Sequence, residues 1–415
     1  MKNSPLEILM ISYWDFQDEG MQVTKRTPLF FASRGHRIVF MVHSETTEAP
    51  SPKAVNHLML QVLRFNLPFK WMNQISFIRR FRQFMLFAWC CILGAWKIYR
   101  NGRKPDVIYA AEADAVLIGT ILRRIYRVPL VTRFYGISRI QAHFDFTTMK
   151  LKPMGVKHYF SKLALTRRAD MVIVTDDGSQ GLEIIKALNP YIKRIKSWRN
   201  GTDAPNFLPK DIARARSSFK IRSDQFVLMT LCRLDRWKGV DLAIRALNFI
   251  PDNILKNLKL LVVGHGSELI ALKKLVNANH LDENVIFAGG VPHRDIYTCY
   301  HLADIFLSLY RYSNVGNPLW EALNSGCCII TLNTGATGEI IQDGLNGRLL
   351  AYSLDEKNLI KNIAGAVCEL YSKPILRKKL QNGAIKYSQK NIWSWEKRLS
   401  EEVKAIEEVV QQSSK

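Results

Sequence analysis

The sequence predicts an α/β protein with two doubly wound domains. Short apolar strands alternate with helical patterns along the whole chain, an order typical of parallel sheets covered by helices. The 415 residues are enough for two domains of about 150–200 residues each. The composition, with 47% apolar and 23% charged residues, is that of a globular protein. Such sheets bind ligands beyond the carboxyl ends of their strands, so we expect functional residues directly after strands.

The first half of the chain has the elements of one such domain. A helix around Thr27–Ser33 leads through Arg34-Gly35-His36 into a strand. The strands expected in this half are Ile8–Ile11, Arg37–Val42, Val107–Ala110, Leu130–Phe134 and Met171–Thr175.

The second half repeats the scheme. Its expected strands are Phe226–Leu231, Leu260–Val263, Val285–Ala288, Ile305–Leu309 and Cys328–Thr331. Between the halves, the segment RNGTDAPNFLP within Lys196–Pro209 is rich in turn-forming residues. We therefore expect one domain over residues 1–198, a second over 199–391, and a final helix over 392–415 with Trp393 and Trp395 near its start.

The segment Phe65–Arg103 is unusually apolar and basic. Its central run, Phe84–Trp96, has 13 residues without a charge and is flanked by arginine and lysine. Because a spanning helix needs about 20 apolar residues, this run should not cross a bilayer. It can dock on a membrane interface through its aromatic residues or be a buried crossover helix, and we expect a helix that does both. The aromatic residues concerned are Trp71, Phe77, Phe81, Trp89 and Trp96.

The positive charge is concentrated in the first half. Residues 1–200 contain 31 Lys and Arg against 14 Asp and Glu, whereas residues 201–415 contain 28 against 22. The net charges are therefore +17 and +6, which sum to the +23 of the whole chain. An uneven charge of this kind favours an anionic partner of the first half. No nucleic-acid-binding signature accompanies it, so we expect an anionic membrane surface or a lipid phosphate and no nucleic acid.

Cysteine usage and the start of the chain bear on location. The seven cysteines include no Cys-x-x-Cys pair and mostly lie in apolar runs, which favours reduced thiols in a cytoplasmic protein. The apolar run at the start is too short for a signal peptide, and Glu7 lies where the apolar core of one would begin. We expect a cytoplasmic protein, peripheral on the inner face of the membrane.

The stretch Ser313–Leu350 carries the most chemistry. A Gly-Asn-Pro turn, Gly316–Pro318, comes directly before a helix that contains Glu321. The amide groups and the dipole of a helix start favour an anion, usually phosphate. Glu321 lies one turn into the helix, where its carboxylate can accept hydrogen bonds from hydroxyl groups such as those of a ribose. Further along, Gly335 and Gly338 form a glycine-rich loop.

Two further motifs follow strands of the second half. Arg233 and Lys238 come after Phe226–Leu231, where two cations can neutralise a diphosphate and the charge that develops as it departs. The alternative is two solvated surface charges. Gly264-His265-Gly266 suggests a dinucleotide fold, but Leu269 occupies the third glycine position of that motif. A tight turn beside a nucleotide, with Gly264 close to the ligand, is the better interpretation.

Ser313–Leu350 resembles the nucleotide-sugar signature of family 4 retaining glycosyltransferases of the GT-B fold. That signature is a Glu, a Gly three residues later, a second Glu, and a glycine-rich segment that ends in Asn-Gly. Here the Gly is Gly316, the second Glu is Glu321, and Asn346-Gly347 closes the segment. The first position departs from the signature, because Ser313 replaces the Glu that reaches the transferred sugar in relatives.

The resemblance implies a GT-B protein with two Rossmann-like domains facing a cleft. A basic acceptor domain comes first, a nucleotide-sugar domain second, and the final helix crosses back to the first domain. An Asn-Gly-x-Asp turn at the hinge is matched by Asn200, Gly201 and Asp203. Arg233 and Lys238 are then the diphosphate clamp, and transfer proceeds with retention and without a metal ion or other cofactor. The donor is a nucleoside diphosphate sugar, and the acceptor is a lipid-linked or surface glycan.

The resemblance also assigns site residues. With Arg233, Lys238 and Glu321 as the catalytic set, the donor-binding residues are Gly20, Gly264, Val291, Ser313, Asn314, Gly316, Asn317, Pro318 and Leu319. Glu112 and Tyr135 follow strands of the first half and are candidates for orienting the acceptor, with plain structural roles as the alternative. We interpret Ser313 as a sign of altered donor preference.

Two other functions remain open. Because Ser313 replaces a family carboxylate, the chain could be a non-catalytic GT-B scaffold that binds nucleotide or glycan. A sugar-nucleotide epimerase of similar architecture is the alternative among enzymes. The sequence does not reveal the donor sugar, the base, the acceptor or the linkage.

Overall fold

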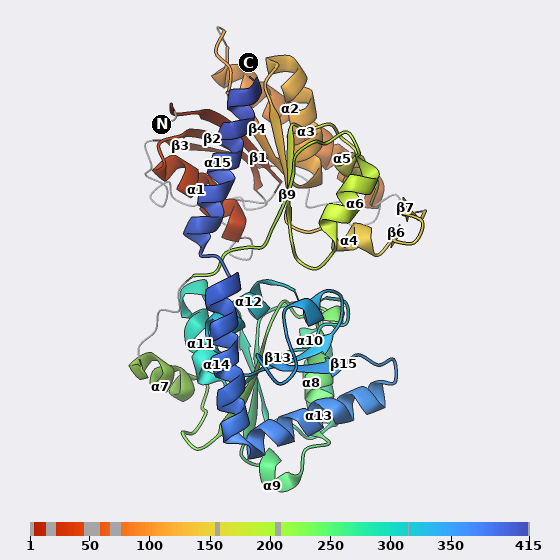
Figure 1. Cartoon of the computed structure of the whole chain (residues 1–415), viewed down its shortest axis with the longest axis vertical. Coiled ribbons are helices and arrows are strands. Elements are labelled where there is room, and N and C mark those ends of the chain that lie inside the picture. The colour runs from red at the N-terminus through yellow and green to blue at the C-terminus, as the bar shows by residue number, and fades with distance from the viewer. Residues whose placement is uncertain are drawn as a thin grey trace. The chain divides into compact units, whose positions relative to one another are not determined.

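The computed structural model describes residues 4–13, 22–44, 59–66, 76–100, 102–153, 158–203, 209–313 and 315–413. The chain forms two compact units (Figure 1). Unit 1 consists of Met1–Arg199 and Glu396–Lys415, and unit 2 of Asn200–Trp395. The domain divisions expected from the sequence, 198/199 and 391/392, lie one and four residues before the observed ones.

Unit 1 is built on a seven-stranded sheet of order β3-β2-β1-β4-β5-β8-β9. All neighbouring strands are parallel. The chain order reverses between β1 and β4, so the loops after these two strands diverge at the carboxyl edge. The strands are β1 (Glu7–Ser12), β2 (Arg37–Ser44), β3 (Leu60–Asn66), β4 (Val107–Ala111), β5 (Leu130–Phe134), β8 (Met171–Thr175) and β9 (Ile195–Trp198). A short antiparallel pair, β6 (Phe144–Asp145) and β7 (Lys150–Leu151), lies outside the sheet.

Helices cover both faces of this sheet. One face packs against α1 (Gln22–Ser33) and α15 (Trp395–Ser413). The other face packs against α2 (Ser76–Ile98), α3 (Glu112–Tyr126), α5 (Tyr159–Leu165) and α6 (Gly181–Leu188), and the single turn α4 (Ser138–Gln141) adds Ile140. In Figure 1, α15 runs along α1 over the sheet although it is last in the sequence.

α15 is held to unit 1 by apolar and charged contacts. Leu399, Val403, Ile406 and Val409 repeat at helical spacing and are buried. The buried Glu402 accepts hydrogen bonds from Tyr109 Oη (2.5 Å) and Arg398 Nη1 (2.6 Å). Burial alone would raise the pKa of the Glu402 carboxyl, but the guanidinium groups of Arg398 and Arg133 lower it overall. The last helix therefore returns to the first unit, as the resemblance implies.

Unit 2 is built on a six-stranded parallel sheet of order β12-β11-β10-β13-β14-β15. Here the chain order reverses between β10 and β13, which makes their carboxyl ends the switch point of the sheet. The strands are β10 (Phe226–Leu231), β11 (Leu258–Val263), β12 (Val285–Gly289), β13 (Ile305–Ser308), β14 (Ile329–Asn333) and β15 (Arg348–Ala351).

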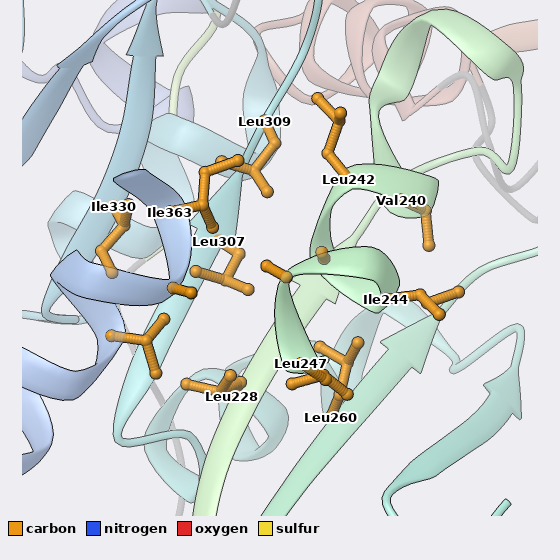
Figure 2. Packing of buried hydrophobic residues seen from close by; sticks show 14 of the residues in the cluster. Leu228, Val240, Leu242, Ile244, Leu247, Leu260, Leu307, Leu309, Ile330 and Ile363 are labelled. Carbon is orange, nitrogen blue, oxygen red and sulfur yellow. The ribbon is translucent and has the colours of Figure 1, made fainter. Parts of the chain in front are cut away.

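Helices also cover both faces of the second sheet. α8 (Val240–Leu247), α10 (Leu269–Ala278) and α13 (Glu356–Ser372) pack on one face, and Figure 2 shows side chains of α8 and α13 against β10, β11, β13 and β14. α7 (Pro209–Ser218), α11 (Ile296–Leu302) and α12 (Asn317–Asn324) pack on the other. α14 (Pro374–Asn391) packs beside α12, and α9 (Asp252–Leu255) precedes β11.

Three strands of the two large sheets were not expected from the sequence, and all three lie at sheet edges. β3 and β9 are the outermost strands of unit 1, and β15 is outermost in unit 2. Interior parallel strands are buried on both faces and are continuous apolar runs, whereas edge strands are half-exposed and keep polar residues. The sequence IKSW of β9, with every residue half-buried, shows the difference.

Candidate functional site

The candidate site lies at the carboxyl edge of the unit 2 sheet, around the β10/β13 switch point. The loop after β10 contains Arg233 and the 3₁₀ turn Arg236–Lys238. The loop after β13 leads through Ser313 to the start of α12. Both loops begin where a buried strand ends, so the sheet determines the position of their first polar residues.

The two cations of the first loop are positioned in different ways. Arg233 has a side chain 69% exposed and forms an ion pair with Asp235 at 2.6 Å. The Lys238 ammonium lies 3.7 Å from the ring centroid of Tyr310 and 3.8 Å from that of Trp237. Arg233 is therefore accessible to an anion from solvent, and Lys238 is held at the junction of the two loops.

The loops after β10 and β13 are tied together. The Arg311 amide donates to the Trp237 carbonyl at 2.8 Å, and the Arg311 guanidinium donates to both oxygens of Asp241, at 2.8 and 2.9 Å. Gly239, at φ +68°, lies so close to the second loop that a Cβ would be 2.0 Å from the Leu309 carbonyl oxygen. Only glycine fits this close approach.

The start of α12 faces the same edge of the sheet. Gly316 is the N-cap, and Pro318 occupies the first turn, where its missing N–H costs least. The Leu319 side chain is buried in the core, and its amide donates to the Gly316 carbonyl at 3.0 Å. Asn317 accepts a hydrogen bond from Asn200 Nδ2 at 2.9 Å. Leu319 therefore anchors the start of the helix in the core. The backbone amides at this edge come from Gly316 and Asn317, because Pro318 has no N–H.

Glu321 is a buried carboxylate in a polar network. Its Oε2 accepts from Tyr300 Oη at 2.9 Å, and its Oε1 lies 3.4 Å from His293 Nε2. Burial, and then the Glu321 charge, raise the pKa of the Tyr300 hydroxyl, which keeps Tyr300 a donor. His293 Nδ1 lies 3.9 Å from Asp203 Oδ2 in the Asn-Gly-x-Asp turn. The network connects the loop after β12 with α12.

Ser313 lies against the glycine-rich loop after β14. A Cβ on Gly335, at φ +54°, would be 3.0 Å from Ser313 Cβ. The Ser313 hydroxyl accepts a hydrogen bond from the Val315 amide at 3.4 Å. The loops after β13 and β14 thus meet at Ser313. Asn314 and Gly20 lie outside the described residues.

Gly264 and Val291 lie at the same edge, after β11 and β12. Gly264 has φ +132°, and a Cβ there would be 1.9 Å from the Cys232 carbonyl oxygen. His265 Nε2 accepts from the Gly290 amide at 2.7 Å, which ties this turn to the residue before Val291. Val291 itself is half-buried against the core. His265 is thus part of a contact between these two loops.

The candidate acceptor residues lie at the carboxyl edge of unit 1. Glu112 begins α3 with φ +68°, an unfavourable backbone conformation for a residue with a Cβ. Its Oε1 accepts from the Tyr135 amide at 2.7 Å, so the structure brings the two together. Burial raises the pKa of the Tyr135 hydroxyl. Next to them, a Cβ on Gly136 would be 2.4 Å from Asp177 Oδ2.

The described residues also bear on metal binding and on membrane crossing. No three His, Cys, Asp or Glu side chains in the described part of the chain gather in an arrangement that could hold a metal ion. None of its helices is long and apolar enough to cross a bilayer. The described cysteines are free thiols, either buried or half-buried.

The arrangement in unit 2 suits an anionic ligand that carries hydroxyl groups. Arg233, Lys238 and the α12 start supply positive charge, and Glu321 supplies a hydrogen-bond acceptor. Sequence reasoning did not predict the partners of Glu321, which are His293 and Tyr300. His293 follows β12 at the carboxyl edge, and this position after a strand could have identified it as a candidate site residue. Tyr300 lies within α11, where no sequence pattern indicates a site residue.

Comparisons with known proteins find similarity to glycosyltransferases, most of it in unit 2. Residues 211–387 match the family model described as "Glycosyl transferases group 1". An uncharacterized glycosyltransferase of Methanocaldococcus jannaschii is 30% identical over 179 residues, which cover 43% of this chain and 44% of that protein. A lipopolysaccharide core biosynthesis mannosyltransferase of Rhizobium leguminosarum bv. viciae is 24% identical over 286 residues, which cover 68% of this chain and 73% of that protein. The matches to the first curated relatives span only 44% to 58% of their length.

Solved structures of similar fold cover nearly the whole chain. The crystal structure of HepE from Anabaena in complex with UDP-glucose superimposes with a TM-score of 0.70 at 19% identity, and covers 96% of this chain and 100% of that one. The family match lies within the unit that contains Arg233, Lys238 and Glu321. Unit 2 is therefore similar to the group 1 glycosyl transferases, and the two Rossmann-like units of the chain have the GT-B fold.

Proposed function

We propose that the chain is a retaining glycosyltransferase that moves a sugar from a nucleoside diphosphate sugar to an acceptor hydroxyl. The observation that carries the proposal is that Arg233, Lys238 and the start of α12 all follow β10 and β13, the two strands at the switch point of unit 2. Two cations and a helix start next to a buried carboxylate fit a diphosphate followed by a ribose. The UDP-glucose complex of the HepE structure supports a donor of this class.

In the proposed reaction, the anomeric carbon of the sugar loses its bond to the phosphate oxygen of the donor. It gains a bond to the acceptor oxygen on the same face, and the acceptor proton passes to the departing phosphate oxygen. Arg233 and Lys238 stabilise the negative charge that grows on this diphosphate. We extend the proposal to metal independence, because these groups supply the positive charge that a metal ion would supply.

Glu321 takes the role of ribose binding. Tyr300 and His293 hold its two oxygens, which fixes the carboxylate at the edge of the sheet. A carboxylate oxygen that accepts one hydrogen bond keeps a second lone pair for a ligand hydroxyl.

The proposed acceptor is a lipid-linked or surface glycan, bound by unit 1 near Glu112 and Tyr135. The similarity to a lipopolysaccharide core mannosyltransferase supports an envelope glycan. We place the protein in the cytoplasm, peripheral on the inner face of the membrane. The net charge of +17 over residues 1–200 supports an anionic surface as partner.

A panel of nucleotide sugars, each radiolabelled in the sugar, tests the proposal when lipid and glycan extracts are added as acceptors. The expected result is release of free nucleoside diphosphate together with a labelled product. Nuclear magnetic resonance of that product should show the donor's anomeric configuration, and a metal chelator should leave the rate unchanged.

Other outcomes select the alternative functions. Binding of nucleotide sugar without turnover across the panel identifies a scaffold. An altered sugar that is still joined to its nucleotide identifies an epimerase. A rate that chelation abolishes and added metal ion restores contradicts the metal-independent mechanism.

A further inference from the structure

One face of α2 carries a row of exposed apolar side chains. Phe81, Met85, Trp89, Leu93 and Trp96 repeat every three or four residues and are 47%, 50%, 60%, 38% and 60% exposed. This spacing places them on a single helix face. The opposite face of α2 is buried in the core of unit 1 through Phe87, Cys91 and Ala95. A surface helix is normally polar where it meets water, so an apolar stripe of this length marks an interaction surface.

The charges around the stripe are positive. The sequence of α2 contains no acidic residue, and Arg82 and Lys97 lie exposed near its two ends. α3 packs beside α2 and adds the exposed Ile121 and Ile125 (41% and 55%), with the exposed Arg124 between them in sequence (Figure 1). The surface therefore combines apolar residues with positive charge across two neighbouring helices.

An arginine-rich pocket opens on α3 next to these isoleucines. Its volume is about 530 Å³. Four arginines and two threonines line it: Thr120, Arg123, Arg124, Thr166, Arg167 and Arg168. A second basic pocket shares Arg123 and Arg168 with it and adds Lys193 and Arg194. Arg123 pairs with Asp170 at 3.0 Å, and Arg167 donates to the Leu163 carbonyl. The exposed Arg124 and Arg168 beside them suit a phosphate group.

We propose that the α2–α3 face of unit 1, defined by Phe81, Met85, Trp89, Leu93, Trp96, Ile121 and Ile125, docks on an anionic phospholipid bilayer. The apolar side chains enter the interfacial region, and the arginine-rich pocket holds a lipid phosphate. Tryptophan suits this depth because its ring is apolar while its N–H remains near water. The inference rests on the peripheral membrane location proposed above and names the surface responsible, but the docking does not depend on the proposed transferase activity.

Charge selects the bilayer over a second copy of this chain. In a symmetric dimer through this face, each basic border would meet the same basic border of the other copy. Like charges brought together in this way oppose association. A bilayer rich in phosphatidylglycerol presents the opposite charge and attracts the nearby Lys and Arg side chains.

Flotation of the full chain with vesicles tests the proposal. Vesicles of phosphatidylcholine alone are compared with vesicles that also contain phosphatidylglycerol, without any nucleotide. We expect binding to the anionic vesicles that weakens as salt is raised, because exposed charges are screened within about 10 Å at 0.1 M salt. Brominated lipid should quench the tryptophan fluorescence of the bound protein.

Two double variants separate the apolar and charged contributions. Trp89→Glu with Trp96→Glu should weaken vesicle binding at least about tenfold and abolish the quenching by brominated lipid. Its control is Ile270→Glu, at a position on α10 that is 71% exposed.

Arg124→Gln with Arg168→Gln should weaken binding to anionic vesicles about tenfold or more. Its control is Lys378→Gln with Lys379→Gln on α14, which removes the same charge. All the changed side chains are exposed, and circular dichroism checks that each variant folds.

Three results would overturn the proposal. The first is the absence of vesicle binding by the unaltered chain, and the second is binding that the Trp89 and Trp96 changes leave intact. The third is a dimer in sedimentation analysis that those changes dissociate, which would identify a second copy as the occupant. Equal binding to neutral and anionic vesicles contradicts the selection of an anionic bilayer by the arginine-rich pocket. Because no sugar donor is present, these results are independent of whether the chain transfers a sugar.

Discussion

At the scale of single residues, Arg233 and Lys238 carry the proposed stabilisation of the leaving diphosphate. Replacing either residue with Ala should lower turnover on the order of a hundredfold, as the loss of one charge-stabilising donor does in other enzymes. Steady-state kinetics with the best donor of the panel measures the effect. The control is Lys274→Ala on α10, which removes an exposed charge. Unchanged turnover in both Arg233→Ala and Lys238→Ala would show that the clamp lies elsewhere.

Glu321 should determine how tightly the nucleoside diphosphate binds. Glu321→Ala removes a hydrogen-bond acceptor of the ribose and should weaken binding by roughly 1.5–3 kcal/mol. Titration calorimetry with uridine and guanosine diphosphates measures the change. Glu283→Ala, an exposed position just before β12 and so at the opposite edge of the sheet, is the matched control. Equal affinity of Glu321→Ala and the unaltered chain would contradict ribose binding by this residue.

Ser313 should govern which sugar is accepted. Serine is shorter than the family Glu and has one donor and two acceptor lone pairs, which leaves room for a bulkier or differently oriented sugar. Ser313→Glu should therefore lower activity with the native donor and raise it with an ordinary hexose donor. Relative kcat/KM values for the two donors measure the shift. If Ser313→Glu converted an inactive chain into an active transferase, the scaffold alternative would be correct.

The sequence predicts a residue's place well where a strand precedes it. Arg233, Gly264 and Glu112 each follow a buried apolar run, and the structure places each at a carboxyl edge. Contacts between loops could not be predicted in the same way. The approach of His293 to Glu321 depends on how the loop after β12 packs against α12, and no spacing within either segment encodes this packing.

At the scale of elements, α15 should be the acid-sensitive part of unit 1. Burial lowers the pKa of His36, whose Nδ1 accepts from the Leu6 amide and whose Nε2 lies 3.4 Å from Glu407 on α15. The neutral form is thus favoured by folding, and its stabilisation is lost as the pH falls below the unfolded value of about 6.5. Glu402 has a lowered pKa, so its stabilisation is complete above about pH 4.3 and is lost as the pH falls further.

Both groups therefore weaken the docking of α15 on acidification. Hydrogen exchange of the α15 amides, relative to that of α8, should accelerate between pH 7 and pH 5 as His36 is protonated, and further below about pH 4.3 as Glu402 is protonated. Glu402→Gln should destabilise unit 1 by about 3–5 kcal/mol, because it leaves Arg398 and Arg133 buried without a matching charge. Glu408→Gln, at an exposed position on the same helix, is the control and should change stability by less than about 0.5 kcal/mol. Equal destabilisation by the two variants would contradict this account.

The edge strands mark the limit of prediction at this scale. The apolar runs of β5, β8 and β10 gave their bounds without error, because such strands are buried on both faces. β3 mixes apolar and polar residues along LQVLRFN, and the sequence pattern did not distinguish it from an irregular segment. A half-exposed strand obtains its structure from the neighbour it pairs with, here β2, and that pairing is not a local property.

At the scale of the whole molecule, a nucleoside diphosphate should stabilise one unit and not the other. The proposed ligand groups Arg233, Lys238 and Glu321 all lie in unit 2. Ligand at a hundred times its Kd stabilises by about 2.7 kcal/mol, which corresponds to roughly 5–10 °C for a unit of this size. Differential scanning calorimetry should show the transition of unit 2 rising while that of unit 1 stays in place. Arg233→Ala should reduce the rise, and an equal rise of both transitions would contradict a site confined to unit 2.

The path of the chain between the units affects how the protein is made. Unit 2 is inserted between two parts of unit 1, because α15 is translated after Trp395 but packs against β1, β2 and β4. The ribosome adds about 5–20 residues per second, so roughly 10–40 s separate the synthesis of the unit 1 sheet from that of its last helix. During this interval the apolar face that receives Val403, Ile406 and Val409 has no cover from α15. The nascent chain is therefore a natural substrate for a chaperone, and slowing translation within unit 2 should increase aggregation even though the sequence is unchanged.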